Sequence, residues 1–547
     1  MIDAKFENVQ ALIVDDFDNF RVMLFNMLKE LGVPRVDVAS SDKEALRLCE
    51  VSAYNLILCD QNLGAGKTGQ QILEFLRHTP NFNNDSIFVL ISGESNKNII
   101  MAAFDHEPDD YLTKPITSRA LAQRLGRLLT QRLALAPIYA ALKDSNLELA
   151  INLCKREIQE NKRYNNHCKK LLGDLLLDAR RSSDAEQLYR DILDVHQLDW
   201  AQLGMARVKQ MQGDSLSAQH WLEEAIQYNP YCLKAYDVLA EVLSELGDFP
   251  AQQNVLIQAL KLSPFSLLRQ QALATIALRN NDLLNAVAAF RSAAKLGENS
   301  CHDRPDIHVG FARATIQLAK IDRNMPRPVL RDALKSVGEF SARFGNTADN
   351  KVNALLLEAQ LHSSVGDDRK SREAMLSAQK IIDVDYDQLT LPTKIERVNA
   401  SRAINEIAKA DELTRELLGE YSHNEDALRQ IDSLLEEPCS EMNKALVAKI
   451  NKDGIAFYDA KEFVRAIQAF NGALQGFPKH VGLRLNLVQA LVAQLTLKPL
   501  DQQLFLLAQQ TLVSVAPLIS SNHAQYLRFR QLEDSFKRLE SGKSLPH

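Results

Sequence analysis

The chain has 547 residues, of which 46% are hydrophobic and 24% are charged, and its formal net charge is -6. This composition is typical of a globular protein, and the length allows several domains or one domain followed by an array. The mildly acidic balance gives no reason to expect a nucleic-acid partner. No apolar run approaches the roughly 18 residues of a membrane span, and the first residues lack the pattern of a signal peptide. We therefore expect a cytoplasmic protein without membrane insertion.

Seven cysteines are scattered along the chain, with no C-x-x-C pair and no companion histidine at metal-ligand spacing. We expect reduced thiols, most of them packed in the interior. They are Cys49, Cys59, Cys154, Cys168, Cys232, Cys301 and Cys439.

Residues 1–130 alternate between short apolar runs and helical patterns. The apolar runs are residues 11–14, 36–39, 56–60, 86–91 and 111–113. Helical patterns begin at Asn19, after Ser41, at Gln70, at about Asn96 and near Thr117. Runs without polar alternation indicate strands that are covered on both faces. The alternation therefore predicts an α/β domain, in which a doubly wound, five-stranded parallel sheet has helices on both sides.

Polar residues stand at the carboxyl ends of these predicted strands. They are Asp15, Asp16, Asp60, Ser92 and Lys114. In a parallel sheet all these ends lie at one edge, where such sheets bind their ligands, so we expect the five side chains to converge.

Three carboxylates at this edge repel one another, at a cost of about 4 kcal/mol for each pair at 4 Å and an effective dielectric of 20. A hard divalent cation such as Mg²⁺ relieves this repulsion, because it prefers oxygen ligands. Lys114 supplies a fixed positive charge beside the carboxylates. The set suits phosphoryl transfer onto Asp60, with Ser92 donating a hydrogen bond to the incoming group.

Four stretches, residues 12–17, 58–62, 91–94 and 109–115, resemble the motifs of the receiver domain of bacterial response regulators. The resemblance covers residues 8 to about 130 and implies a flavodoxin-like fold. It further implies that Asp60 is phosphorylated by a sensor histidine kinase or a phosphotransfer protein. In such domains Asp16 and Asp60 would bind Mg²⁺ directly, Asp15 would act through water, and the backbone carbonyl of Asn62 would complete the protein ligands.

The resemblance also assigns the remaining site residues. Lys114 and Ser92 would hold the phosphoryl group, and Tyr111 would turn inward when Ser92 moves. The bond from Lys114 to Pro115 would be cis. Leu63-Gly64 replaces the usual Met-Pro of the family, and because this change lies in a loop it leaves the choice of kinase open.

The remainder, from residue 131, is helical in pattern and carries a repeat. Gly213, Ala225 and Pro230 recur 34 positions later as Gly247, Ala259 and Pro264. A unit of 34 residues is the length of the tetratricopeptide helix-turn-helix. The alanines suit close helix crossings, where added bulk costs about 1–3 kcal/mol.

The clearest single unit lies between Gly454 and Pro478, and a weaker one lies around Ala359 to Ala378. The segment from Pro392 to Pro438 is helical but off the pattern, and helices near 502–515 and 523–539 are expected to cap the array. We expect a receiver domain at 1–130, repeats at 131–300, degenerate or spacer repeats at 301–440, and terminal repeats with capping helices at 441–547.

A repeat array of this kind presents a concave surface to a peptide or a partner protein. We therefore expect a response regulator whose output is protein binding rather than catalysis. A DNA-binding output would need a helix-turn-helix or a basic patch, and a catalytic output would need a phosphate-binding loop or a nucleophile motif, and the sequence past residue 130 has neither. The alternative is a constitutive scaffold with a silent receiver domain.

Overall fold

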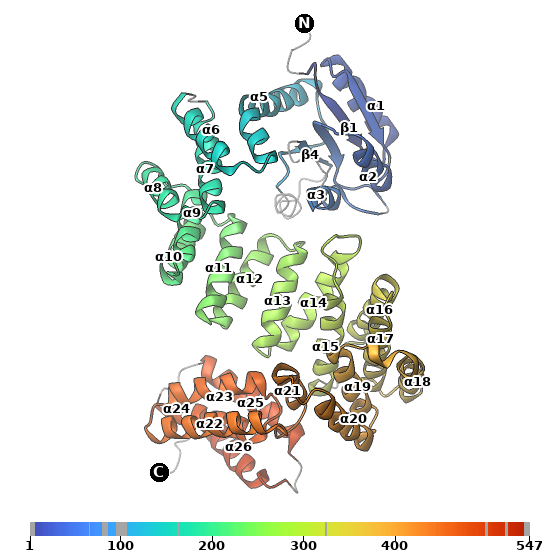
Figure 1. Cartoon of the computed structure of the whole chain (residues 1–547), viewed down its shortest axis with the longest axis vertical. Helices are drawn as coiled ribbons and strands as arrows, with labels where there is room; N and C mark the ends of the chain where they lie inside the picture. The colour runs from blue at the N-terminus through green and yellow to red at the C-terminus, as the bar shows by residue number, and fades with distance from the viewer. Residues whose placement is uncertain are drawn as a thin grey trace. The chain divides into compact units, whose positions relative to one another are not determined.

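The computed structural model of the chain divides into two compact units, Met1–Ser336 and Val337–His547, and each is described by itself (Figure 1). The structure describes residues 6–64, 66–78, 86–93, 107–160, 163–322, 325–497, 502–519 and 523–540. The helix expected from about Asn96 to His106 lies outside these residues.

The first unit begins with a parallel five-stranded sheet in the order β2-β1-β3-β4-β5. The strands are β1 (Gln10–Val14), β2 (Arg35–Ala39), β3 (Leu56–Asp60), β4 (Ile87–Ser92) and β5 (Asp110–Thr113). Every residue of β3 and β4 is buried, as the uninterrupted apolar runs predict for strands covered on both faces. The strand order is that of flavodoxin-like folds, so the predicted fold class of this domain is confirmed.

Helices cover both faces of the sheet. They are α1 (Asp18–Glu30), α2 (Asp42–Val51), α3 (Gly69–His78) and α5 (Ser118–Lys143). Because successive strand residues point to opposite faces, Leu58 packs with α1 and α5 in one apolar cluster, whereas Ile57 packs with α2 and α3 in the other. This arrangement leaves the carboxyl edge of the sheet for polar side chains.

Local signals set the helix ends. The Ser41 side chain accepts a hydrogen bond from the Glu44 amide and caps α2. The Glu44 carboxylate accepts from the Ser40 amide at 2.8 Å, one residue earlier than a capping box predicts. Gly32, after α1, has φ of 92°, which glycine adopts without strain and which gives the helix a left-handed end.

Helix α5 joins the sheet domain to the helical region without a break (Figure 1). Its first half packs Leu121 and Leu125 against the sheet, and its second half places Leu135 and Ile138 in the first core of the helical region. One helix thus contributes to two cores and connects the two regions directly.

Antiparallel helices follow in the rest of the first unit. They are α6 (Leu147–Glu160), α7 (Asn165–Asp178), α8 (Ser182–Leu193), α9 (Asp199–Met211), α10 (Ser215–Tyr228), α11 (Leu233–Leu246), α12 (Phe249–Leu262), α13 (Leu267–Arg279), α14 (Leu283–Gly297), α15 (Pro305–Ile321) and the start of α16 (Arg327–Phe344).

The repeat is visible in the turns within successive helix pairs. Asp214, Asp248 and Asp282, spaced 34 residues apart in the sequence, each accept a backbone hydrogen bond at the start of α10, α12 and α14. The residue before each aspartate has a positive φ, and it is glycine at 213 and 247. A left-handed residue followed by an N-cap aspartate therefore ends one helix and starts the next in each repeat.

Small residues allow the helices to cross closely. A Cβ atom added to Gly204 would lie 2.2 Å from Cζ of Tyr189, and one added to Gly173 would lie 2.3 Å from its hydroxyl oxygen. Tyr189 is 1% exposed, so its ring fills the space that the two glycines leave. The repeat alanines, such as Ala206 and Ala225, are fully buried in the same way.

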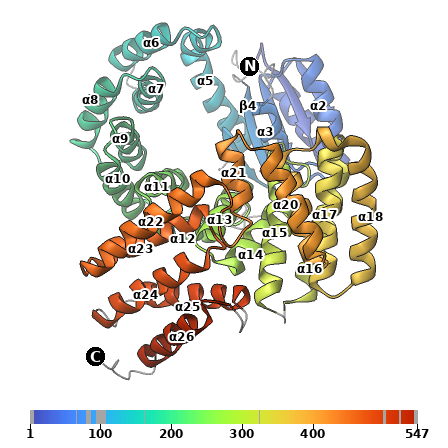
Figure 2. The same cartoon turned by 60° about the horizontal axis from the view of Figure 1, so that its bottom comes forward.

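The second unit is wholly helical over its described residues (Figure 2). It contains α17 (Ala348–Ser364), α18 (Asp368–Asp385), α19 (Leu391–Ala403), α20 (Ile407–Glu420), α21 (Glu425–Asp432), α22 (Glu441–Asp459), α23 (Phe463–Gly476), α24 (Val481–Leu497), α25 (Gln502–Val515) and α26 (Tyr526–Glu540), with short 3₁₀ turns at Tyr386–Gln388 and Ala516–Leu518. None of the described helices of the chain is both long and apolar enough to cross a lipid bilayer. The architecture is a flavodoxin-like domain followed by a tetratricopeptide-type helical solenoid.

Candidate functional site

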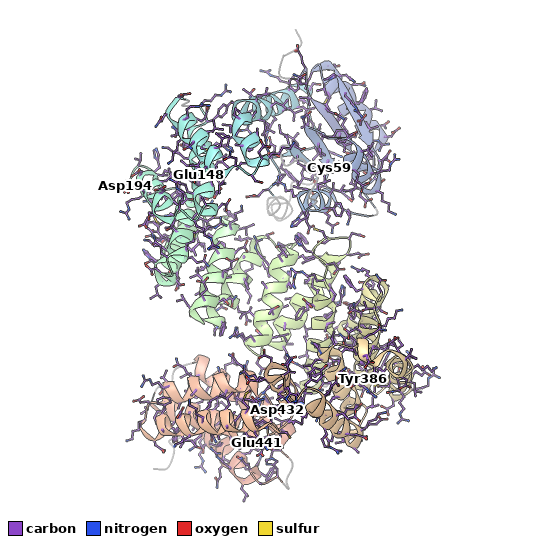
Figure 3. The ribbon with its side chains drawn as sticks, viewed as in Figure 1. Cys59, Glu148, Asp194, Tyr386, Asp432 and Glu441 are labelled. Carbon is purple, nitrogen blue, oxygen red and sulfur yellow. The ribbon has the colours of Figure 1, made fainter. Side chains whose placement is uncertain are left out.

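The carboxyl edge of the sheet brings the predicted acidic residues together. Asp15 and Asp16 directly follow β1, and Asp60 is the last residue of β3. One carboxylate oxygen from each of the three lies within 4.8 Å of the others. Asp15 and Asp60 are 1% and 6% exposed, whereas Asp16 is exposed. Cys59, labelled in Figure 3, lies beside this edge on β3.

Lys114 supplies the positive charge that the three acids require. Its Nζ donates to Oδ2 of Asp15 at 2.8 Å and to Oδ2 of Asp60 at 2.7 Å. Burial acts to lower the pKa of Lys114, but these two hydrogen bonds outweigh it and raise the pKa. The ammonium group also lies 4.0 Å from the centre of the Phe20 ring, a cation–π contact that sequence reasoning missed.

Opposing effects act on the pKa of Asp60, the predicted phosphoacceptor. Burial raises the pKa of its carboxyl group, while the hydrogen bond and charge of Lys114 oppose that rise. An ionised carboxylate is the nucleophilic form. Lys114 therefore favours the state of Asp60 that can accept a phosphoryl group.

Backbone contacts hold the turn after β1. The amide of Phe17 donates to Oδ1 of Asp15 at 2.8 Å, and Nη1 of Arg21 donates to the Asp15 carbonyl at 2.6 Å. Arg21 is itself paired with Asp18 at 2.7 Å. These contacts fix the direction of the Asp15 carboxylate, and sequence reasoning did not identify Arg21.

The loop after β3 is shaped around Asp60. The amide of Asn62 donates to Oδ1 of Asp60 at 3.4 Å, and the amide of Gly64 donates to the Asn62 side chain at 3.2 Å. A Cβ atom added to Gly69 would lie 2.2 Å from the Asp60 carbonyl oxygen, so only glycine fits where α3 begins. Gly69 therefore shapes the site, a role that sequence reasoning did not identify.

Ser92, Tyr111 and Pro115 lie on the neighbouring strands. Ser92 ends β4, is 4% exposed, and accepts through its carbonyl a hydrogen bond from the Lys114 amide at 2.8 Å. Tyr111 is 8% exposed and packs in the cluster on the α2 and α3 side of the sheet. The bond from Lys114 to Pro115 is cis, as expected. All the predicted site residues except Tyr111, which lies in the first half of β5, thus lie at or beyond the carboxyl ends of β1, β3, β4 and β5.

The donor set at this edge fits Mg²⁺. The three aspartates offer only oxygen ligands, and Asp16 is accessible from solvent while Asp60 is nearly buried. Oxygen donors with room for water match the preference of Mg²⁺, which retains several waters when it binds protein carboxylates.

Helices α11, α12 and α13 of the repeats face Asp60 across a cavity of about 1100 Å³. Asp60 and Lys114 lie on its sheet side, and Lys234, Asp237 and Arg269 lie on its solenoid side. Arg269 is 6% exposed and makes a bidentate ion pair with Asp237. Its Nε lies 2.6 Å from Oδ1 of Asp237, and its Nη2 lies 2.8 Å from Oδ2. The carboxyl edge at Asp60 therefore opens onto helices α11 and α13 of the repeats.

Direct contacts connect the sheet domain to the repeats within the first unit. Lys234 on α11 pairs with Glu107. Burial alone would raise the pKa of Glu107, but Lys234 outweighs it and lowers the pKa. On the other side, Nε2 of Gln71 on α3 donates to the Glu298 carbonyl, between α14 and α15, at 3.0 Å.

The cysteines are all free thiols. Cys59, Cys154 and Cys168 are buried, as expected for packed thiols. Cys301 and Cys439 are exposed, so the expectation of packing does not hold for these two.

Comparison with known proteins agrees with this geometry. Residues 11–126 match the family described as "Response regulator receiver domain". "Chemotaxis protein CheY-3" of Vibrio cholerae is 25% identical over 122 residues, which are 22% of this chain and 92% of that protein. A CheY-like receiver domain from Methylobacillus flagellatus is 30% identical and aligns with 22% of this chain and 98% of its own, with a TM-score of 0.20.

The helical part has its own structural neighbour. The C-terminal part of a TPR repeat-containing protein from Cytophaga hutchinsonii aligns with 46% of this chain and 95% of its own, at 13% identity and a TM-score of 0.34. The chain thus contains a response regulator receiver domain at residues 11–126, followed by a helical region of the tetratricopeptide type.

Proposed function

We propose that this protein is a response regulator that receives a phosphoryl group on Asp60 and reports it through protein binding by its repeats. The donor is a sensor histidine kinase or a phosphotransfer protein, and the location is the cytoplasm. The observation that carries the proposal is the Lys114 ammonium bridging Asp15 and Asp60 at an edge where three carboxylates meet.

The residues of the edge have distinct parts in the proposed transfer. A carboxylate oxygen of Asp60 forms the new bond to phosphorus, while the bond from phosphorus to the donor breaks and its electron pair leaves with the donor. Lys114 and the Ser92 hydroxyl hold the phosphoryl oxygens, and water is limited by the burial of Asp60.

Magnesium would be held by Asp16, Asp60 and the Asn62 carbonyl, with Asp15 acting through water. When bound, it neutralises charge on the phosphoryl oxygens. This chain's own contribution is to place the three carboxylates and Lys114 before the donor arrives.

The output is proposed to pass through the contacts between the receiver domain and the repeats. A phosphoryl group adds about 1.5 to 2 negative charges and three acceptor oxygens at Asp60. The cavity beyond Asp60 is lined by Lys234 and Arg269. A phosphoryl group there competes with Glu107 and Asp237 for ion pairs with Lys234 and Arg269. This competition changes the relative stability of two packings of the receiver against the repeats. Tyr111 and Ser92 are the proposed switch residues within the receiver.

The proposed output is binding of a partner protein, with no catalytic reaction of its own. Helix pairs of this type offer a concave face to peptides and proteins.

The first test is phosphoryl incorporation. The full chain is incubated with Mg²⁺ and a small acyl or amide phosphodonor, and the mass of the intact protein is measured. Incorporation that disappears in Asp60→Asn and persists in Asp194→Asn, which changes an exposed aspartate after α8, supports the proposal. Incorporation that survives in Asp60→Asn, or none in the wild type, contradicts it.

The alternative is a constitutive scaffold whose receiver is silent. A pull-down that compares beryllofluoride-treated with untreated protein distinguishes the two, because beryllofluoride mimics the phosphoryl group. A partner whose recovery changes with treatment, and changes only when Asp60 is present, supports the regulator. A partner recovered equally in all cases supports the scaffold.

A further inference from the structure

We propose that His78, Cys301, His302 and Glu74 form a second metal site, specific for Zn²⁺ or a similar thiophilic ion, that joins the receiver domain to the repeats. His78 and Glu74 lie on α3 of the receiver, and Cys301 and His302 lie in the loop between α14 and α15. All four are in the first unit.

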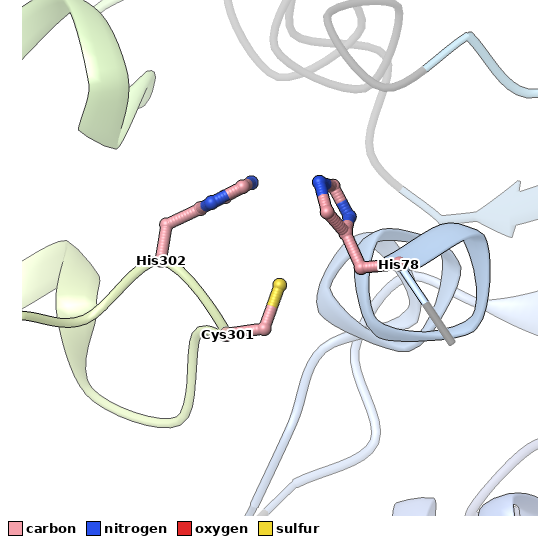
Figure 4. Close-up of side chains that lie close together, drawn as sticks. All are labelled: His78, Cys301 and His302. Atoms are coloured by element: carbon pink, nitrogen blue, oxygen red, sulfur yellow. The ribbon is translucent and has the colours of Figure 1, made fainter. Parts of the chain in front are cut away.

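The three nitrogen and sulfur donors already face one another. One ligand atom from each of His78, Cys301 and His302 lies within 4.8 Å of the other two. The two imidazole rings meet edge to face, with centroids 4.6 Å apart. Figure 4 shows the Cys301 sulfur directed toward the space between the rings. Side chains from two distant parts of the sequence therefore converge on one point.

The tautomer of His78 leaves a ligand nitrogen available. Its Nδ1 lies 2.8 Å from the Glu74 carbonyl oxygen, which only accepts, so Nδ1 carries the proton and donates. The lone pair then resides on Nε2. Ligating histidines commonly have such a backbone partner on the other nitrogen, because it fixes the orientation of the ring.

Glu74 adds a negative charge beside His302. It is 5% exposed, and its Oε1 accepts from the Ser300 hydroxyl at 2.8 Å and lies 3.2 Å from Nε2 of His302. A buried carboxylate is costly unless it is paired, and a bound cation would pair it.

The donor types select the ion. Two imidazoles, a thiolate and a carboxylate are ligands of zinc, whereas Mg²⁺ prefers oxygen alone. Bonds of about 2.0–2.3 Å place tetrahedral ligands roughly 3.5 Å apart. The donors must therefore approach by about 1 Å, which side-chain rotation of exposed His78 and Cys301 allows.

A metal at this point would reinforce contacts that are already present. Gln71 and Glu74 on α3 bond to Glu298 and Ser300 of the same loop. The ion would hold α3 against the α14–α15 loop and so limit separation of receiver and repeats. This inference does not depend on phosphorylation of Asp60.

The test uses the full chain with excess Mg²⁺, which saturates the aspartate site. Purified metal-free protein is titrated with Co²⁺, and thiolate-to-cobalt charge-transfer absorption is recorded, followed by displacement with Zn²⁺. We expect about one equivalent to give the thiolate band and Zn²⁺ to remove it. The aspartate site has no sulfur ligand and cannot produce this band.

Variants identify the ligands. Cys301→Ser should lose the thiolate band, and His78→Gln should weaken Zn²⁺ binding by more than about 100-fold, since loss of a direct ligand exceeds the 10–100-fold effect of an outer-shell partner. Matched controls are Cys439→Ser and His220→Gln, which change exposed residues outside the cluster. Circular dichroism checks that all variants retain their helices.

The thiolate band and the Zn²⁺ affinities of the variants decide whether the site exists. A band that is lost in Cys301→Ser and kept in Cys439→Ser supports the site. No thiolate band in the wild type, or a band that survives in Cys301→Ser, overturns it. Equal weakening by His78→Gln and His220→Gln would also overturn it.

Discussion

Nζ of Lys114 lies 2.7 Å from Oδ2 of Asp60, and the same ammonium group lies 2.8 Å from Oδ2 of Asp15. The Asp15 and Asp60 side chains are 1% and 7% exposed, against 21% for Lys114. The lysine therefore compensates two buried charges from a position that still touches solvent.

Lys114→Met should destabilise the metal-free protein. The change leaves two buried carboxylates without their cation, and we expect a loss of about 2 kcal/mol, below the 3–5 kcal/mol of a fully buried pair because Lys114 is partly solvated. Urea unfolding in chelator measures it. Mg²⁺ should recover more stability in Lys114→Met than in the wild type. Lys43→Met, at an exposed position of α2, should stay within about 0.5 kcal/mol. Equal effects of the two variants would refute the role of Lys114.

Asp16→Asn should weaken Mg²⁺ binding. The exposed carboxylate is the proposed direct ligand that is most accessible to a hydrated ion. In the wild type, Mg²⁺ at 100 times its dissociation constant should add about 2.7 kcal/mol of stability, and a chelator should remove it. Asp16→Asn should lose most of this gain at the same Mg²⁺ concentration, while Asp194→Asn, at an exposed position after α8, should keep it. Calorimetric titration gives the two affinities directly, and a full Mg²⁺ effect in Asp16→Asn would exclude Asp16 as a ligand.

Gly454→Ala should destabilise the second unit. A Cβ atom there would lie 2.5 Å from Cε1 of Phe470, whose ring is 1% exposed and cannot move aside freely. We expect a loss of about 1–3 kcal/mol from overpacking. Gly472→Ala is the matched control, because its added Cβ meets nothing within 4 Å. That control should gain about 0.5–1 kcal/mol from helix propensity. Thermal unfolding of the two variants should shift in opposite directions, and parallel shifts would count against the close crossing of α22 and α23.

Glu420→Gln should destabilise the protein in a pH-dependent manner. Burial alone would raise the pKa of Glu420, but hydrogen bonds from Lys394 and Tyr386 outweigh it and lower the pKa below its ordinary value of 4.5. Lys394 is 6% exposed, and its Nζ lies 2.6 Å from Glu420 and 4.2 Å from the Tyr386 ring centre. The variant leaves this buried ammonium without its carboxylate.

The direction of the pH dependence follows from the lowered pKa of Glu420. The stability that Glu420 contributes is fully present above pH 4.5 and is lost as the pH falls through the lower folded value. We expect Glu420→Gln to cost about 1 kcal/mol at neutral pH, after allowance for the partial exposure of Glu420, and less at pH 3. Glu462→Gln, which changes an exposed pair with Arg465, should have little effect at either pH. Urea unfolding at both pH values tests this, and a constant difference would refute it.

The second unit also contains a buried carboxylate network that sequence patterns did not reveal. Asp432, labelled in Figure 3 with Glu441, is 1% exposed and accepts from the Cys439 amide at 2.8 Å and from Nδ2 of Asn443 at 2.9 Å. It ties the end of α21 to the start of α22. The segment before it, from Pro392, was predicted to be helical and off the repeat pattern, and it forms α19, α20 and α21.

The acidic edge was predictable because each of its residues ends a strand. Uninterrupted apolar runs mark strands that are buried on both faces, and parallel strands bring their carboxyl ends to one edge. Asp60 and Lys114 are 54 residues apart, yet the sheet places them in contact whatever the details of the loops. Phe20 and Arg21 escaped prediction because their roles depend on the direction in which α1 leaves the turn.

By itself, the sequence determined the alternation of strands and helices, the 34-residue period and the residue types at the sheet edge, since all three are read from local patterns. Only the tertiary structure decided which repeats face Asp60 and which residue joins Cys301 and His302. Their partner His78 lies on another domain, and nothing in local spacing records it. Contacts of this kind depend on the angles at which successive helices pack, and these angles arise from side-chain fit along the whole array.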